Sequence, residues 1–301
     1  MIRPLDFASE TLLAQLNVLG KRLERVQREI SSGYRVNTAS DAPDQVADIL
    51  ALRASLAANE QVRTNLQRAR SEVETADGAL ARVVQVLDRA LALAAAGSGT
   101  QPSENRYTIA QEVRGLEEQL VALSRTMYGD RYLFSGDLDT QPCYGMGEDG
   151  TVERLATAEA TRKVQHPSGV SFPIAKTAQE IFDHRDAEDN PTAKNVFAAV
   201  TALRVALEAD DQAAVEAVIG KLRAASAHVN AQTGFYGAVH NRIKAALDDA
   251  GRMDLRLQTA LSERRDTDVV ASVMELQQVQ LSQAAAMQMR AMTPARSLFD
   301  Y

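Results

Sequence analysis

The stretch LLAQLNVLGKRLERVQREI, residues 12–30, decides the fold class of this chain. Its large aliphatic residues recur at intervals of four and three, which places them along one narrow stripe of an α-helix: Leu12, Leu16, Leu19, Leu23, Val26 and Ile30. Such a stripe is a coiled-coil seam, and a partner helix must cover it. Gly33 follows, and glycine readily takes the left-handed conformation that ends a helix. The stretch therefore predicts a long N-terminal helix that packs against a second helix.

Comparable apolar spacings continue along most of the chain. They predict further helices over residues 43–97, 109–127, 197–207, 215–264 and 267–292. A helix as long as the one expected over residues 43–97 cannot bury its stripe against itself, so the N-terminal and C-terminal helical regions are expected to contact each other. The sequence predicts a mainly α fold, in which both termini contribute to an elongated, coiled-coil-like helical stalk.

The character of the sequence changes between residues 137 and 190, where Gly, Pro, Asp and Thr become frequent. Short stretches at residues 151–157, 160–165 and 170–174 suit strands separated by turns. We interpret this region as a small β-rich inserted head that can be shortened without loss of stalk folding, since its strands share no periodic seam with the helices. The expected division of the chain is into residues 1–44, 45–136, 137–190, 191–268 and 269–301.

Composition and charge argue against several classes of protein. Only 5% of residues are aromatic and Trp is absent, which disfavours an aromatic-lined ligand pocket. A net charge of −7 gives no general attraction to nucleic acid, and no uncharged run of about 18 apolar residues predicts membrane insertion. Asp6 and Glu10 stand where a cleaved signal peptide would need an apolar run, and the lone Cys143 excludes an intrachain disulfide.

Three motifs imitate ligand sites without their context. The run GMGEDG, residues 145–150, satisfies a dinucleotide fingerprint, but a strand-like stretch follows it and its two acidic residues would repel phosphate. The loop that begins at Asp137 has Pro142 where a calcium loop needs Gly. The four His residues show no metal-ligand spacing. We therefore expect no cofactor, no metal site and no catalytic constellation, and hence no enzyme.

The last segment, residues 269–301, is poor in charge. Its only charged residues are Glu275, Arg290, Arg296 and Asp300. A weak stripe of Val269, Val273, Leu276 and Met287 is interrupted by Gln280 and Gln283. The segment therefore lacks an autonomous coiled-coil seam, and we expect it to be mobile in the monomer and to become ordered against neighbours on assembly.

Several motifs resemble those of the flagellin family. SSGYRVNTASDAP at residues 31–43 resembles the family's Ser-Ser-Gly, Arg-(Ile/Val)-Asn and Asp signature after the first helix. YTIAQEVRGLEEQLVALSRT at 107–126 and GDRYLFSG at 129–136 are similar to the segment that closes its N-terminal helical region. Residues 262–291 and the ending SLFDY at 297–301 resemble the family's C-terminal helix and tail. Because these motifs occur in the family's order, the chain is identified as a member of it.

Within the family, residues 40–80 resemble the junction proteins between hook and filament more closely than the filament flagellins, through Ser40-Asp41, Pro43 and the step from Gln61 to Asn65. The resemblance implies a structural adaptor that polymerises through its terminal helices into a tubular assembly in the extracellular flagellum, after export without a cleaved signal peptide. The implied partners are flagellin, a hook-proximal junction protein, a cytoplasmic flagellar export chaperone and further copies of the chain.

The resemblance also implies where assembly contacts lie, because family members use both chain ends for the inner tube. The expected interface residues are Leu12, Leu16, Leu19, Leu23, Val26, Ile30, Val273, Leu276, Gln280, Gln283, Met287, Leu298 and Phe299. Two alternatives stay open: a short filament flagellin, and a cytoplasmic coiled-coil scaffold. The β-rich interruption and the uncharged terminal helix argue against the scaffold.

Overall fold

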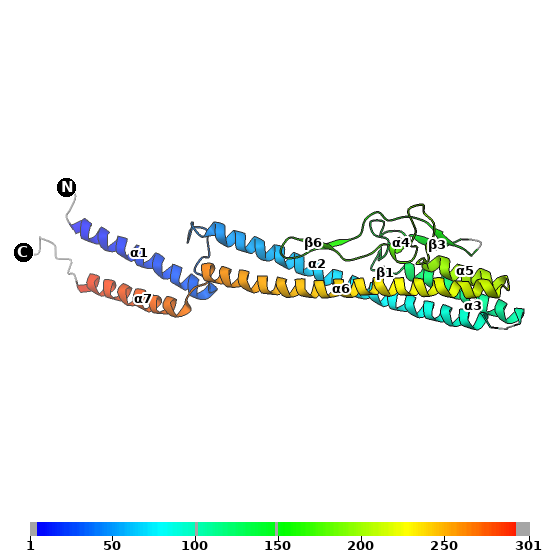
Figure 1. Ribbon diagram of the computed structural model, residues 1–301. Helices are drawn as coiled ribbons and strands as arrows, with labels where there is room; N and C mark the ends of the chain where they lie inside the picture. The colour runs from blue at the N-terminus through cyan, green and yellow to red at the C-terminus, as the bar shows by residue number, and fades with distance from the viewer. Residues whose placement is uncertain (1–4, 100–101, 148–149, 293–301) are drawn as a thin grey trace, which may run out of the picture. The chain divides into compact units, whose positions relative to one another are not determined.

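The computed structural model describes residues 5–99, 102–147 and 150–292. These residues form two compact units: a terminal unit from the described parts of the ranges 1–58 and 253–301, and a central unit from the described part of residues 59–252. Seven helices run through the described residues (Figure 1): α1 (Leu5–Ser32), α2 (Val46–Gly97), α3 (Ser103–Ser124), α4 (Ala178–Ile181), α5 (Val196–Glu208), α6 (Gln212–Arg265) and α7 (Val269–Met292).

The helices confirm the mainly α prediction and most of its boundaries. α2 and α6 have 52 and 54 residues, which is about 80 Å each at 1.5 Å per residue. α1 ends where the sequence predicts, because Gly33 has a φ of +75° and its amide donates to the Glu29 carbonyl at 2.9 Å. Long helices therefore come from both termini.

The core of the central unit is built from aliphatic residues of α2, α3, α5 and α6. Leu80, Leu120, Leu203 and Leu222 are completely buried, and they belong to one continuous cluster. α3 packs beside α5, and the Asn59 side chain of α2 donates to the Ala250 carbonyl of α6 at 2.9 Å. The expected contact between the N-terminal and C-terminal helical regions is confirmed.

Within the described residues, six short strands form three antiparallel hairpins. β1 (Met127–Tyr128) pairs with β2 (Arg131–Tyr132), β3 (Tyr144–Met146) with β4 (Val152–Arg154), and β5 (Lys163–Gln165) with β6 (Ser171–Pro173). The three strands predicted over residues 151–174 correspond to β4, β5 and β6, and each is shorter than predicted. The run at residues 145–150 is followed by β4 and not by the helix that a dinucleotide fingerprint requires.

Residues of the head share the core of the helices. This differs from the independent head expected from the sequence. The ring centroid of Phe182, after α4, lies 5.5 Å from that of Phe134 and 5.7 Å from that of Phe197 in α5. Phe172 of β6 is also buried in the same cluster as the helix leucines. These aromatic residues follow no helical period, so spacing could not reveal that they share the core. We no longer expect the stalk to fold normally when the head is shortened.

Candidate assembly interface

α1 and α7 pack against each other in the terminal unit and run antiparallel (Figure 1). The α1 seam predicted from residues 12–30 faces this contact. Val26 is fully buried, while Leu12, Leu16, Leu19, Leu23 and Ile30 are half-buried and alternate with exposed positions. The seam thus first serves packing within the chain. Its role in contacts between subunits stays a prediction.

The face of α7 that packs on α1 differs from the stripe expected from the sequence. Its most buried residues are Ser272, Val279 and Ala286, which are 5%, 2% and 7% exposed, and Leu276 and Gln283 are half-buried beside them. α7 therefore has a seam within the chain, contrary to the expectation. Hydrophobicity did not mark this seam, because two of its residues are small and Gln283 is polar.

The other predicted α7 residues lie outside this seam. Val273, Gln280 and Met287 recur every seven residues and are exposed. Next to them, facing away from α1, are Val270, Met274 and Leu281, which are 71%, 67% and 72% exposed. We call these six residues the outer face of α7. Leu298 and Phe299 lie outside the described residues.

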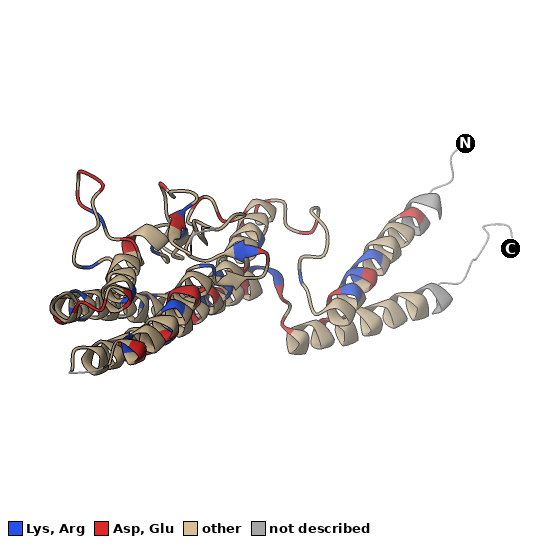
Figure 2. Cartoon of the chain, turned by 90° about the vertical axis from the view of Figure 1, so that its right-hand side faces the viewer, with Lys and Arg blue, Asp and Glu red and all other residues tan. Residues whose placement is uncertain are grey.

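The outer face combines exposed apolar side chains with an absence of charge. From Leu276 to Met289 the sequence contains no charged residue, and Figure 2 shows α7 almost free of the charges that α1 carries. A helix in water normally bears charges on its outer side, and contiguous exposed apolar surface marks interaction sites. A groove of about 500 Å³ lies along the α1–α7 pair, lined by Thr11, Ala14, Gln15, Val18, Leu19, Ser282, Ala286 and Met289.

Glu275 connects α7 electrostatically to α1. Its Oε1 accepts from Arg22 Nε at 2.6 Å and from Arg25 Nη2 at 2.9 Å. The hydrogen bond from Arg22, together with the charge of both guanidinium groups, lowers the pKa of the Glu275 carboxyl, although partial burial opposes this. Because this charged contact joins one position of α7 to two positions of α1, it helps to fix the α1–α7 register.

The segment between α1 and α2 pairs with the segment between α6 and α7. The Arg35 amide donates to the Arg265 carbonyl at 2.8 Å, and the Thr267 amide donates to the Gly33 carbonyl at 3.0 Å. The Arg265 guanidinium lies 3.7 Å from the centroid of the Tyr34 ring. The segment that follows α1 and the segment that follows α6 are therefore held together by these contacts inside the terminal unit.

Asp41 organises the loop that follows Tyr34. Its Oδ2 accepts from the backbone amides of Asn37 at 2.9 Å and Thr38 at 2.7 Å. The hydrogen bond donated by the Thr38 amide is the main cause that lowers the pKa of the Asp41 carboxyl. This gives a structural reason for the Asp of the SSGYRVNTASDAP motif, whose side chain caps the turn.

A buried polar network fastens the head to α5. Asp183 is 3% exposed, and its carboxylate accepts from the Tyr144 hydroxyl at 2.9 Å, Asn195 Nδ2 at 2.6 Å and Arg185 Nε at 2.9 Å. Burial and the Asp183 charge raise the pKa of Tyr144 far above its usual value.

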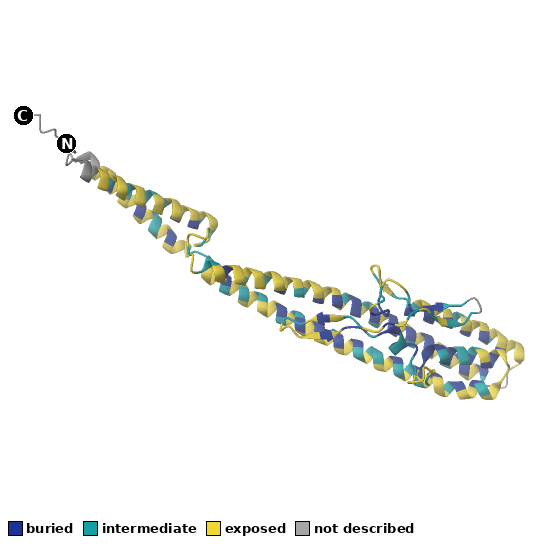
Figure 3. Ribbon diagram, turned by 90° about the horizontal axis from the view of Figure 1, so that it is seen from above, coloured by how far each residue is buried: buried dark blue, intermediate teal, exposed yellow. Residues whose placement is uncertain are grey.

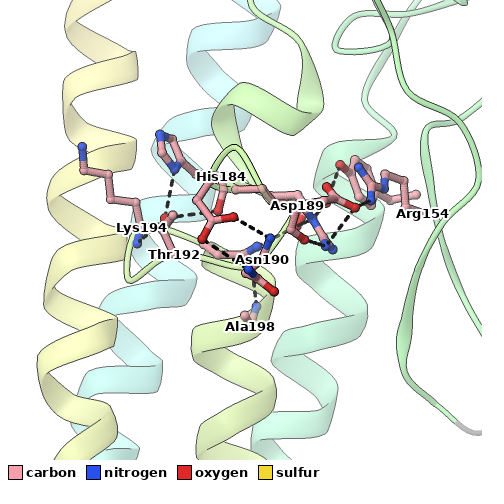
Figure 4. Close-up of polar contacts among 12 residues, drawn as sticks. Arg154, His184, Asp189, Asn190, Thr192, Lys194 and Ala198 are labelled. Carbon is pink, nitrogen blue, oxygen red and sulfur yellow. Dashed lines mark hydrogen bonds and ion pairs between the residues drawn. The ribbon is translucent and has the colours of Figure 1, made fainter.

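The loop after this network is closed by a surface ion pair. In Figure 4, Arg154 reaches Asp189 at 2.6 Å. Both carboxylate oxygens of Asp183 accept hydrogen bonds. We therefore interpret the Asp183 network as a structural contact that holds the head on α5, and not as a reactive site.

Ligand chemistry finds little support among the described residues. No group of three or more His, Cys, Asp or Glu side chains within residues 5–99, 102–147 and 150–292 is placed to hold a metal ion. No helix in the described part of the chain is long and apolar enough to cross a membrane. The outer face of α7 is therefore the strongest candidate for function.

The chain is similar to known flagellar proteins. Residues 7–139 match the bacterial flagellin N-terminal helical region. Over 270 residues the chain is 24% identical to a flagellin from Halalkalibacterium halodurans, covering 89% of this chain and 86% of that one. It is 25% identical over 274 residues to flagellar hook-associated protein 3 of Salmonella typhimurium, covering 86% and 80%.

A solved structure supports the same fold. Flagellar hook-associated protein 3 from Legionella pneumophila aligns with a TM-score of 0.63 at 13% identity, over 71% of this chain and 98% of that chain. The fold of this chain, with long helices from both termini and hairpins between them, is consistent with the family match over residues 7–139. Residues 7–139 therefore have the N-terminal helical region of the bacterial flagellins, and the chain resembles flagellins and hook-associated protein 3 over most of its length.

Proposed function

We propose that this protein is a structural subunit of the bacterial flagellum that joins the hook to the filament. The observation that carries the proposal is the outer face of α7, where Val270, Met274 and Leu281 are largely exposed on a helix that has no charged residue from Leu276 to Met289. Packing against a neighbouring subunit would remove this surface from water at about 25 cal/mol per Å². Exposure of such a surface in an unassembled chain is unfavourable.

The proposal assigns the two faces of the α1–α7 pair different tasks. The seam from Leu12 to Ile30 holds the pair together inside each subunit. The outer face, with Val273, Gln280 and Met287 along its edge, contacts neighbouring copies in a tubular assembly. Head-to-tail contacts between identical surfaces that do not close on themselves generate such open assemblies. Leu298 and Phe299 belong to the same proposed interface.

The proposed partners follow from the similarity to flagellins and to hook-associated protein 3. They are flagellin on one side, a hook-proximal junction protein on the other, and an export chaperone in the cytoplasm before assembly. Export through the flagellar apparatus would place the protein outside the cell. An enzymatic role has no support in the described residues.

Immunogold labelling of intact flagella tests the location directly. A single band at the boundary between hook and filament is expected. Label along the whole filament would instead favour a short filament flagellin. This alternative stays open because the chain is about as similar to a flagellin, at 24% identity, as to hook-associated protein 3, at 25%. A gene deletion gives the second readout: loss of filaments with secretion of flagellin monomers is expected for a junction protein, whereas loss of filament material alone contradicts it.

A further inference from the structure

Two histidines from distant parts of the chain meet where the head loop lies on α6. The imidazole of His184, in the loop after α4, and that of His228, in α6, have ring centroids 5.2 Å apart in an edge-to-face arrangement. His228 Nε2 is 2.8 Å from the carbonyl oxygen of Glu180, so this nitrogen donates. His184 Nδ1 is 2.9 Å from the Thr192 hydroxyl (Figure 4). The pair thus connects α4, the 184–194 loop and α6.

The surroundings of the pair disfavour positive charge. Lys194 lies in the same loop (Figure 4) and contributes a further positive charge at His228. The Glu180 carboxylate in α4 is occupied by Lys176 Nζ at 2.6 Å, and Arg185 is turned to Asp183. The stretch of α6 from residue 224 to 235 contains no ionisable side chain besides His228, and α5 begins with uncharged residues.

The protonation of His228 is therefore unfavourable in the folded chain. Burial lowers its pKa first, and the charges of His184 and Lys194 lower it further, while the hydrogen bond to Glu180 opposes them only in part. A base whose pKa is lowered on folding contributes full stability above its unfolded pKa of 6.5. That stability declines as the pH falls below this value, because the unfolded or detached state takes up the proton first.

We propose that His184 and His228 form an acid-sensitive latch that holds the 184–194 loop against α6 at neutral pH and releases it when the pair becomes charged. When both rings are neutral they meet edge to face without charge repulsion, and both keep their hydrogen bonds. On acidification two like charges would meet at a contact that also includes Lys194. The aromatic contacts of Phe182 and Phe197 lie outside the pair, so release is confined to the loop.

The chain contains a matched control of opposite sign. His166, in the turn between β5 and β6, places Nε2 at 3.3 Å from Asp249 Oδ2 of α6. A positive charge on the His166 ring would be attracted by the Asp249 carboxylate, whereas positive charges on His184 and His228 would repel each other. A general effect of acid on the head would loosen both.

Hydrogen exchange of the full chain at pH 7.5 and pH 5.0, corrected for intrinsic exchange rates, tests the latch. The reporters are the amides of Thr192 and Asn195, which donate to the carbonyls of His184 and Thr192. We expect their protection to fall about threefold or more at pH 5.0 in the unmodified chain, as like charges come together at a partly exposed contact. Amides of α2 and α3 should change less.

The variants separate the latch from ordinary destabilisation. His228→Gln retains a donor for Glu180 and His184→Phe retains an aromatic ring, and neither can become charged, so each should remove most of the pH dependence. His166→Gln should leave it intact. An equal fall in the unmodified chain and in His228→Gln would overturn the proposal. So would an NMR titration in which His228 gains its proton at or above pH 6.5.

Discussion

In the central unit the seams of four helices meet one another, whereas in the terminal unit α1 and α7 have only each other. Leu66, Leu80 and Leu120 are fully buried in the first case. The leucines of the α1 seam remain half-buried although their spacing is equally regular (Figure 3). A regular seam therefore does not by itself make a core, because burial depends on how many neighbours cover the seam. The terminal unit has apolar surface left for further partners.

The largest expected difference between the units concerns core truncation. Phe182→Ala removes a ring that contacts Phe134 and Phe197 in a fully buried site, and we expect it to lower the free energy of unfolding of the central unit by about 3–5 kcal/mol. Val279→Ala in the α7 seam should cost about 1 kcal/mol, since this thin contact can collapse. Urea unfolding monitored by circular dichroism, with exchange protection of α7, measures both. Equal costs would show that the terminal unit is as well packed as the central one.

A buried ion pair gives the next effect. Arg204 Nε donates to Glu117 Oε2 at 2.8 Å between α5 and α3, and Glu117 is 1% exposed. Arg204→Ala leaves this carboxylate buried without its partner, so we expect a loss of about 3 kcal/mol in unfolding free energy.

Two comparisons sharpen the test of the buried pair. Arg70→Ala breaks the exposed pair with Glu74 in α2 and should cost less than about 0.5 kcal/mol. The double variant Arg204→Met with Glu117→Leu should recover most of the stability lost in Arg204→Ala, because no charge then stays buried. A loss in Arg204→Ala no larger than that in Arg70→Ala would contradict the assigned role of burial.

Two glutamines on neighbouring stripes of α7 separate packing within the chain from assembly. Gln283 is half-buried against α1, so Gln283→Glu should weaken the α1–α7 pair by about 1–2 kcal/mol. Gln280 is exposed, and Gln280→Glu should leave the monomer unchanged while it impairs incorporation into flagella. Exchange protection of α7 and quantification of the protein in purified flagella provide the two readouts. Gln67→Glu, at an exposed site of α2, is the control. Normal incorporation of Gln280→Glu would remove the outer face from the proposed interface.

The smallest expected effect concerns the register of α1 and α7. Glu275→Gln removes the partner of Arg22 and Arg25 and should destabilise the pair by about 0.2–1 kcal/mol, less in high salt. Because the Glu275 pKa is lowered on folding, its contribution is complete above the unfolded value of 4.5 and is lost as the pH falls through the lower folded value. Exchange protection of α7 between pH 6 and pH 3 measures this. A pH dependence unchanged in Glu275→Gln would show that the contact is not made in solution.

The helices were predictable because their signal is local. The spacing of Leu12, Leu16 and Leu19 determines which side of a helix is apolar before any partner is known. The candidate site was predictable only in part. The spacing along α7 points to Val273, Gln280 and Met287, whose assembly role remains a prediction, but it does not reveal the seam residues Ser272, Val279 and Ala286. A small or polar residue becomes part of a seam only through the geometry of the helix that covers it.

The sequence by itself determined the long helices, the end of α1 at Gly33, the hairpin region and the uncharged stretch from Leu276 to Met289, because each depends on residues close together in the chain. Tertiary structure alone decided that Phe134, Phe172 and Phe182 complete the core of the helices, and which side of α7 faces α1. It also decided that His184 meets His228. These contacts join residues far apart in the chain that share no period, and long-range packing alone brings such residues together.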